Sequence, residues 1–166
     1  APSVIGVMIS VGGLSALLGS LAARPLAKAI GYGRAVLAGF CFSVVGLLML
    51  IPAAAFKEWA LLFLVAQQFL GDFGIMIYTI LAVSLQQKLL PEEELARANG
   101  FNQVVNGVGM TVAILIAGWV AETIGVSNTV MLGAGIAVLG IAPLLTPHLM
   151  GIGEEPMGRD EVAAAE

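Results

Sequence analysis

The chain has 166 residues, of which 59% are hydrophobic and only 11% are charged, and its formal net charge at pH 7 is −4. An ordinary soluble domain carries about 25% charged residues, so this composition excludes a soluble globular protein and predicts that lipid surrounds most of the chain. The seven Lys and Arg residues are too few for a nucleic-acid-binding surface.

Five apolar runs are long enough to cross the hydrocarbon core of a bilayer, which takes about 20 helical residues. Runs of this kind must be helices, because the backbone groups at an open sheet edge cannot be satisfied in lipid. We therefore predict an all-α polytopic membrane protein, with a membrane region over residues 1–150 and a disordered, polar tail over 151–166. The predicted spans are about 3–23, 35–56, 59–87, 98–121 and 128–147.

Proline and acidic residues indicate where some of these helices begin and end. Pro91 suits the first turn of a helix, and Glu92–Glu94 favour the positive end of its dipole. The fourth helix is therefore expected to begin before its apolar section. Pro143 and Pro147 are expected to kink or end the fifth helix.

Basic residues fall mainly on one of the two sides that these spans define. Only Lys57 lies on the other side. The positive-inside rule places the basic side in the cytoplasm, which predicts an inner (plasma) membrane protein with an outer N-terminus and a cytoplasmic C-terminus. The residues on the basic side are Arg24, Lys28, Arg34, Lys88, Arg97 and Arg159.

A single carboxylate stands near the middle of the third span. Asp72 is the only charged residue between Trp59 and Gln87, and a central Asp costs about 2.5 to 3.5 kcal/mol on insertion scales. It shares one helical face with Gln68, Thr79 and Gln86. This pattern favours a cavity residue that binds a cation, a proton or a polar substrate group. The alternative is an Asp that pairs with a residue outside these spans or is protonated in place.

The fourth span has a matching polar stripe in its cytoplasmic third, whereas the second and fifth spans have none. Asn102 and Asn106 are candidate substrate contacts, as are Gln68 and Thr79 on the third span. The alternative for these amides is hydrogen bonding between helices. The members of the stripe are Asn99, Asn102, Gln103 and Asn106.

Small residues form a third pattern, because they allow helices to approach closely. The first span contains the pairs Gly12/Ala16 and Ser15/Gly19. The fourth offers Gly107 and Ala113, and the fifth offers Gly133/Ala137.

Two loops carry a resemblance to a known family. "GSLAARPLAKAIGYGRAVLAG" (19–39) and "LQQKLLPEEELARANGFNQVVNGVG" (85–109) resemble loops of the major facilitator superfamily, in the part covering spans eight to twelve of its enterobactin-exporter-like branch. The sequence departs from that pattern at Ala96, where Gly is usual, and at Ala23, where an acid is frequent.

The resemblance implies an incomplete C-terminal half of a major facilitator fold, with spans one to seven missing as partners. It implies that the span over 59–87 lines a central cavity, that the span over 98–121 packs near the other half, and that the second and fifth spans face lipid. It also implies ion pairs that gate the cytoplasmic side. The alternative is that the Arg and Lys residues only set the orientation in the membrane and that the Glu residue only belongs to a solvent-exposed helix start. The gating candidates are Arg24, Lys28, Arg34, Glu93 and Arg97.

The sequence thus predicts part of a secondary active transporter that works by alternating access, with protons as the coupling ion and efflux of a small molecule. We expect no cofactor, because no Gly-rich phosphate loop is present. We expect no metal, because His148 has no second His or Cys nearby. The other classes considered are a non-transporting membrane scaffold and a subunit of an integral-membrane enzyme.

Overall fold

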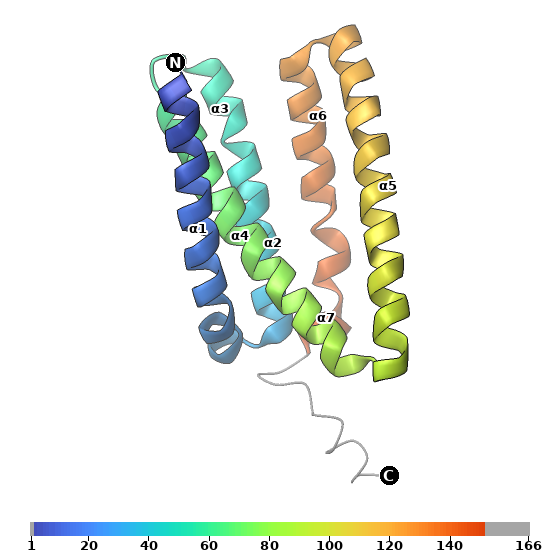
Figure 1. The fold of residues 1–166 in the computed structure, drawn as a ribbon. Coiled ribbons are helices and arrows are strands. Elements are labelled where there is room, and N and C mark those ends of the chain that lie inside the picture. Colours follow the sequence, from blue (N-terminus) through green and yellow to red (C-terminus); the bar gives the residue numbers. More distant parts are fainter. Residues whose placement is uncertain (1, 152–166) are drawn as a thin grey trace.

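A computed structural model describes residues 2–151, which fold into long, nearly antiparallel helices joined by short turns (Figure 1). Within this range, five helical stretches are long and apolar enough to cross a membrane, as the sequence predicts. The predicted tail lies outside the described residues except for Gly151. The elements are α1 (Pro2–Ile30), α2 (Tyr32–Leu48), α3 (Leu50–Ala55), α4 (Ala60–Leu89), α5 (Glu92–Ile124), α6 (Val126–Leu139), the 3-10 turn η1 (Ala142–Leu145) and α7 (Pro147–Met150).

Proline explains two breaks in these spans. The second span divides into α2 and α3 at Met49, because Pro52 has no N–H for the carbonyl of Leu48. Helix α6 ends at Leu139, four residues before Pro143, for the same reason. The predicted interruption of the fifth span is therefore confirmed.

Two other helices extend beyond the predicted spans. Helix α1 continues through Pro25 to Ile30 instead of ending near residue 23, because the buried Ala27 packs against α4 within the main core cluster. Helix α5 begins at Glu92, directly after Pro91, so the predicted early start of this helix is confirmed.

Helix α4 packs between α1 and α2, and glycines bring the three backbones together. Gly46 lies against α4 so closely that a Cβ there would be 2.5 Å from the backbone nitrogen of Gly71. A Cβ on Gly74 would be 2.5 Å from the carbonyl oxygen of Gly39, and one on Gly19 would be 2.5 Å from that of Phe73. The prediction that Ser15/Gly19 supports close helix contact is confirmed, since Ser15 is also fully buried.

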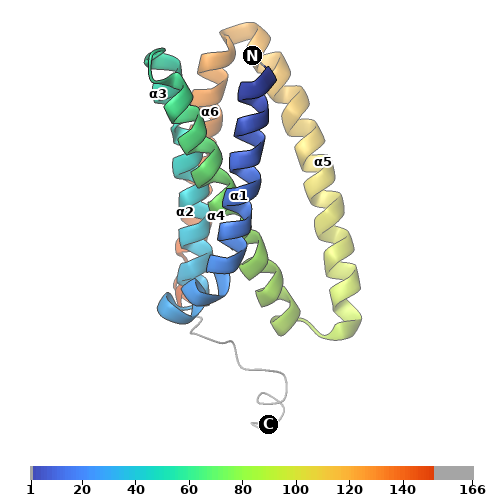
Figure 2. The ribbon, with the colours of Figure 1, turned by 60° about the vertical axis from the view of Figure 1, so that its left-hand side comes forward.

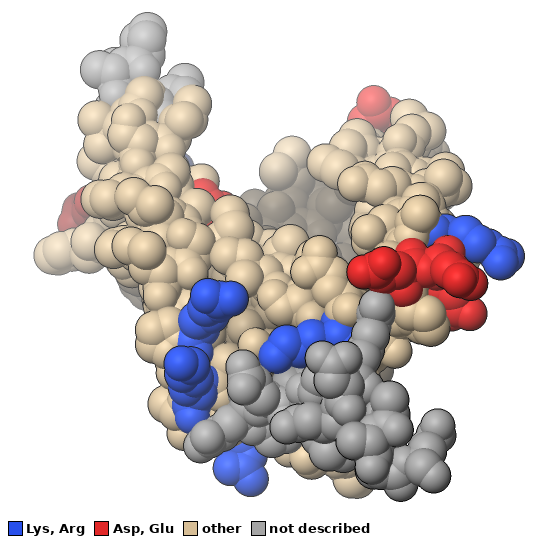
Figure 3. Space-filling model, turned by 60° about the horizontal axis from the view of Figure 1, so that its bottom comes forward, with Lys and Arg blue, Asp and Glu red and all other residues tan. Residues whose placement is uncertain are grey.

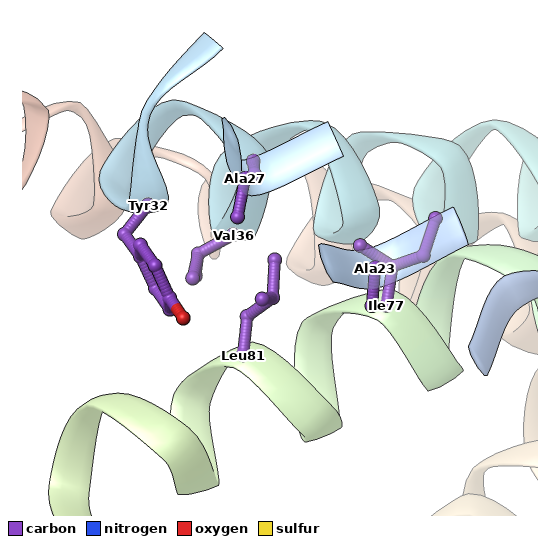
Figure 4. Close-up of a cluster of buried hydrophobic side chains, with 7 residues drawn as sticks. Ala23, Ala27, Tyr32, Val36, Ile77 and Leu81 are labelled. Carbon is purple, nitrogen blue, oxygen red and sulfur yellow. The ribbon is translucent and has the colours of Figure 1, made fainter. Parts of the chain in front are cut away.

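The main hydrophobic core lies where α1, α2 and α4 meet near one end of the molecule (Figure 4). Small residues of α1 and α2 admit the larger Ile77 and Leu81 of α4, which are almost completely buried. The core therefore fixes the lower half of α4 against its two neighbours. Its members are Ala23, Ala27, Tyr32, Ala35, Val36, Ile77 and Leu81.

Helices α5 and α6 pair with each other and leave one side of the molecule open (Figures 1 and 2). Helix α6 also touches α2 and α3, whereas α5 meets α4 mainly near the turn that joins them. No residue of α5 is buried. A Cβ added to Gly107 or Gly133 would meet nothing within 4 Å, so the predicted small-residue contacts there have no partner among the described residues.

Basic side chains gather at the end where α1 and α4 finish and α2 and α5 begin, next to an acidic group (Figure 3). Helix order puts Lys57, Glu58 and Glu122 at the opposite end. Of the six Lys and Arg residues in the described part of the chain, five lie at this end, the basic end of the molecule. The basic residues there are Arg24, Lys28, Arg34, Lys88 and Arg97.

Candidate functional site

Asp72 lies near the middle of α4 and is half-buried. Gln68, one turn earlier, donates a hydrogen bond from Nε2 to Asp72 Oδ2 over 2.6 Å. Residues four apart lie on the same face of a helix, which explains why the two predicted candidates form a pair. While Asp72 is ionised, this is a charge-assisted bond, which is roughly twice as strong as a neutral one.

The Asp72–Gln68 pair faces the backbone of α1 at Gly12. A Cβ added to Gly12 would overlap Asp72 Oδ2 and would lie 2.5 Å from Gln68 Nε2. The carbonyl of Gly12 already accepts a hydrogen bond of 3.0 Å from the Ser15 hydroxyl. Asp72 is thus held between its own helix and a side-chain-free stretch of α1.

A separate cavity of about 570 Å³ opens between α4 and α5. Three of the predicted substrate contacts, Thr79, Asn102 and Asn106, line it, whereas Gln68 and Asp72 do not. No lining residue is charged, and most polar groups are side-chain amides. The lining residues are Ile75, Tyr78, Thr79, Ala82, Val83, Gln86, Asn99, Asn102, Gln103 and Asn106.

Hydrogen bonds organise the cavity wall. Asn102 donates from Nδ2 to Gln86 Oε1 over 3.1 Å, which joins the polar stripes of α5 and α4. The Thr79 hydroxyl donates to the carbonyl of Ile75 over 2.8 Å, so its oxygen lone pairs remain available as acceptors. The cavity can therefore both donate hydrogen bonds to a bound molecule and accept them from it.

The single polar stripe expected on α4 divides into two sites. Its upper members, Gln68 and Asp72, meet α1, whereas Thr79 and Gln86 meet the α5 side. Figure 2 shows how this arises, because α1 crosses α4 near its middle, whereas the lower end of α4 runs toward the start of α5. The stripe is one face of one helix, but two different neighbours approach that face.

Sequence reasoning did not identify Tyr78 as a cavity residue. Its ring packs against Phe40 of α2, with 5.6 Å between ring centroids, and it also lines the cavity. The available signal was its position: Ile75, Thr79, Ala82 and Gln86 follow helical spacing, and Tyr78 adjoins that face.

The gating candidates all lie near the basic end and are all exposed. Arg97 and Glu94 share the wall of a surface cavity of about 710 Å³ with Phe101. Glu93 lines a smaller one of about 340 Å³ with Pro91. Arg24 and Lys28 lie on the last turns of α1, and Arg34 lies at the start of α2. Their gating role remains a prediction.

The sequence profile of the Major Facilitator Superfamily matches residues 1–162. The chain belongs to this superfamily. Searches of curated proteins and of solved structures gave no significant match.

Membership in the superfamily supports a membrane transporter and agrees with the all-α fold. It supports a lipid bilayer and a small-molecule substrate as partners, and it does not favour the scaffold or enzyme-subunit alternatives. The enterobactin-exporter-like branch and the absence of seven further spans stay predictions. Among the described residues, no three His, Cys, Asp or Glu side chains are grouped so that they could hold a metal ion.

Proposed function

We propose that this chain is the C-terminal part of a proton-coupled secondary transporter that exports a small molecule by alternating access. The observation that supports it best is Asp72, the only ionisable acid in the whole length of α4. Ionisable residues inside membrane spans are costly and usually serve function. Asp72 would take up a proton on one side of the membrane and release it on the other.

The cavity between α4 and α5 would bind the substrate. Thr79, Asn102 and Asn106 supply hydrogen-bonding groups along its wall, and Tyr78 adds an aromatic surface. Its position beside α4 supports coupling, because a single helix carries both the acid and half of the cavity wall.

The exposed length of α5 supports the view that further spans of the same transporter cover it. Every side chain from Asn99 to Trp119 is exposed in the described structure. A helix that crosses the membrane beside a cavity normally packs against neighbours. We therefore propose the remaining spans as partners of α5, with the basic end of the molecule in the cytoplasm.

The test is transport by the full-length protein carrying Asp72→Asn, which keeps the shape of the side chain and removes its charge. Vesicles with an imposed pH gradient would be screened for efflux of dyes, drugs and siderophores. Glu58→Gln is the matched control, because it removes an exposed acid outside the spans.

We expect Asp72→Asn to abolish gradient-driven transport while expression and substrate exchange without a gradient persist. Glu58→Gln should behave like the parent. Unchanged, proton-driven transport by Asp72→Asn would contradict the coupling role of this residue. If neither the parent nor the Asp72→Asn variant transports any of the dyes, drugs or siderophores, the proposed export of small molecules would be contradicted.

A further inference from the structure

We infer that Gly12 is a positioning residue for Asp72, and that their contact makes α1 the helix whose packing responds when Asp72 gains or loses a proton. This inference rests on the coupling role proposed for Asp72. It extends the coupling role from α4 to α1, and it gives Gly12 a function in positioning Asp72 although glycine has no side chain.

The argument begins with what a side chain at position 12 would meet. A single methyl group there would overlap Asp72 Oδ2 and would lie 2.5 Å from Gln68 Nε2 and 3.2 Å from Gln68 Cγ. The first two atoms are the acceptor and the donor of one hydrogen bond. Glycine is therefore the one residue type that leaves this bond intact at the observed helix separation.

The separation itself is limited by a neighbouring contact. About two turns after Gly12, Gly19 lies against the backbone of Phe73. Ser15, between the two glycines, is fully buried. Because α1 lies this close to α4 at Gly19 and is buried at Ser15, it has little room to move away and accommodate a methyl group. The Asp72–Gln68 pair would have to move by about 1 Å instead, from overlap to ordinary contact distance.

The adjacent glycine provides the contrast. Gly13 is exposed, and a Cβ added to it would meet nothing within 4 Å. Gly13 is also a glycine of α1, and it lies at almost the same depth in the membrane span as Gly12. A difference between the two positions therefore reports the contact with Asp72 and not a general effect of glycine in α1.

No other charged side chain of the described helices packed on α4 stands beside Asp72. Helix α1 carries Arg24 and Lys28, which lie at least 12 residues beyond Gly12, or about 18 Å along the helix. The titratable groups of α2 are Tyr32 and Arg34 at its start and the thiol of Cys41. Helix α5 carries Glu92, Glu93, Glu94, Arg97 and Glu122, all in its end turns, and α3 and α6 carry none.

Protonation would act on this contact through the hydrogen bond. The bond from Gln68 is charge-assisted while Asp72 is ionised, and it becomes an ordinary neutral bond when a proton is bound. The side-chain pair then holds its position against Gly12 less firmly. The two side chains can then take other positions against Gly12, which turns a proton-binding event into a change at the contact between α1 and α4.

The experiment compares Gly12→Ala with Gly13→Ala in the full-length transporter, using whichever dye or drug the parent exports. Efflux would be measured across a series of external pH values at matched membrane expression. Both variants would also be made in the Asp72→Asn background, and the melting temperature of each purified protein would be recorded.

We expect Gly12→Ala to lower proton-driven efflux by about ten- to a hundredfold, because moving a catalytic or binding group by about 1 Å can cost as much as a hundredfold in rate. We also expect its pH profile to shift. Gly13→Ala should leave both unchanged. In the Asp72→Asn background, Gly12→Ala should lower the melting temperature as it does in the parent but should have no further effect on the response to pH.

Three results would overturn the inference while the coupling role of Asp72 stands. The first is a pH profile for Gly12→Ala that matches that of Gly13→Ala. The second is equal loss of efflux from both glycine variants, which would indicate a general effect on α1. The third is a loss with Gly12→Ala that tracks melting temperature alone. If Asp72→Asn itself transports normally with a proton gradient, the coupling role fails first and the inference fails with it.

Discussion

Asn102 donates a hydrogen bond to Gln86 across 3.1 Å, and this bond joins the polar faces of α5 and α4 above the turn that connects them. Both amides also line the cavity between the two helices. The bond fixes the orientation of the Gln86 amide, which leaves its nitrogen as a donor that can face the cavity. Position 102 therefore bears on the geometry of the cavity wall as well as on its composition.

We predict that Asn102→Ala raises the apparent KM for the exported substrate by about two- to tenfold. A hydrogen bond of this kind contributes about 0.5–1.5 kcal/mol, and its loss frees Gln86 to turn. The maximal rate should change less than KM, because no charge is altered. Initial efflux rates over a range of substrate concentrations would measure both quantities.

Asn128→Ala is the matched control for this substitution. Asn128 is also an exposed membrane-helix amide, but it bonds the carbonyl of Ile124 at the opposite end of α5. Its KM should equal that of the parent. A larger effect at Asn128 than at Asn102 would show that the α4–α5 cavity does not hold the substrate.

The packing of α2 on α4 leads to a prediction about stability. A Cβ on Gly74 would overlap the backbone nitrogen of Ser43 and would lie 2.7 Å from Phe42 Cβ. Gly74→Ala should therefore destabilise the protein by about 1–3 kcal/mol, the usual cost of overpacking. Thermal unfolding in mild detergent would show this as a lower melting temperature.

Gly133→Ala should not lower the melting temperature, because a methyl group there meets nothing within 4 Å and alanine favours the helix by about 1 kcal/mol over glycine. If both substitutions changed stability equally, the close α2–α4 contact would not be a main source of stability.

A cation–π contact ties the end of α4 to the start of α2. Lys88 Nζ lies 5.2 Å from the ring centroid of Tyr32, a residue that is only 8% exposed. We predict that Lys88→Met, which keeps most of the side-chain length, lowers the free energy of unfolding by about 0.5–1 kcal/mol at this partly exposed site.

A double-mutant cycle isolates that contribution, because it subtracts the other contacts that each side chain makes. Lys88→Met should have a smaller effect in a Tyr32→Leu background than in the parent. Equal effects in the two backgrounds, measured by denaturant unfolding in detergent, would mean that the ring and the ammonium group do not interact.

The helices could be predicted from the sequence, but which neighbouring helix packs against each helix face could not. Pro143 and Pro91 mark helix boundaries because their effects are local, acting through one missing N–H and one preferred backbone angle. Asp72 is conspicuous because charge is rare in lipid. Which neighbour meets Asp72 depends on how α1 crosses α4, and that crossing is decided by backbone approach at Gly12 and Gly19. Small residues permit a crossing but do not specify it, so the division of the polar stripe between two sites was not predictable.

The orientation of the molecule in the membrane gives the last prediction. Basic side chains gather at one end of the described helices (Figure 3), and loops rich in Lys and Arg are retained in the cytoplasm. In a full-length parent that lacks its native cysteines, including Cys41, single cysteines would replace Arg34 at the basic end and Glu122 at the other. Both positions are exposed in the described structure, so access depends on the side of the membrane.

A membrane-impermeant maleimide added to intact cells should label the Glu122→Cys protein and should label the Arg34→Cys protein only after permeabilisation. Lys57→Cys, at the same end as Glu122, should behave like Glu122→Cys. The reverse pattern would place the basic end outside. Asp72 would then take up its proton from the opposite compartment, and the proposed direction of coupling would have to be reversed.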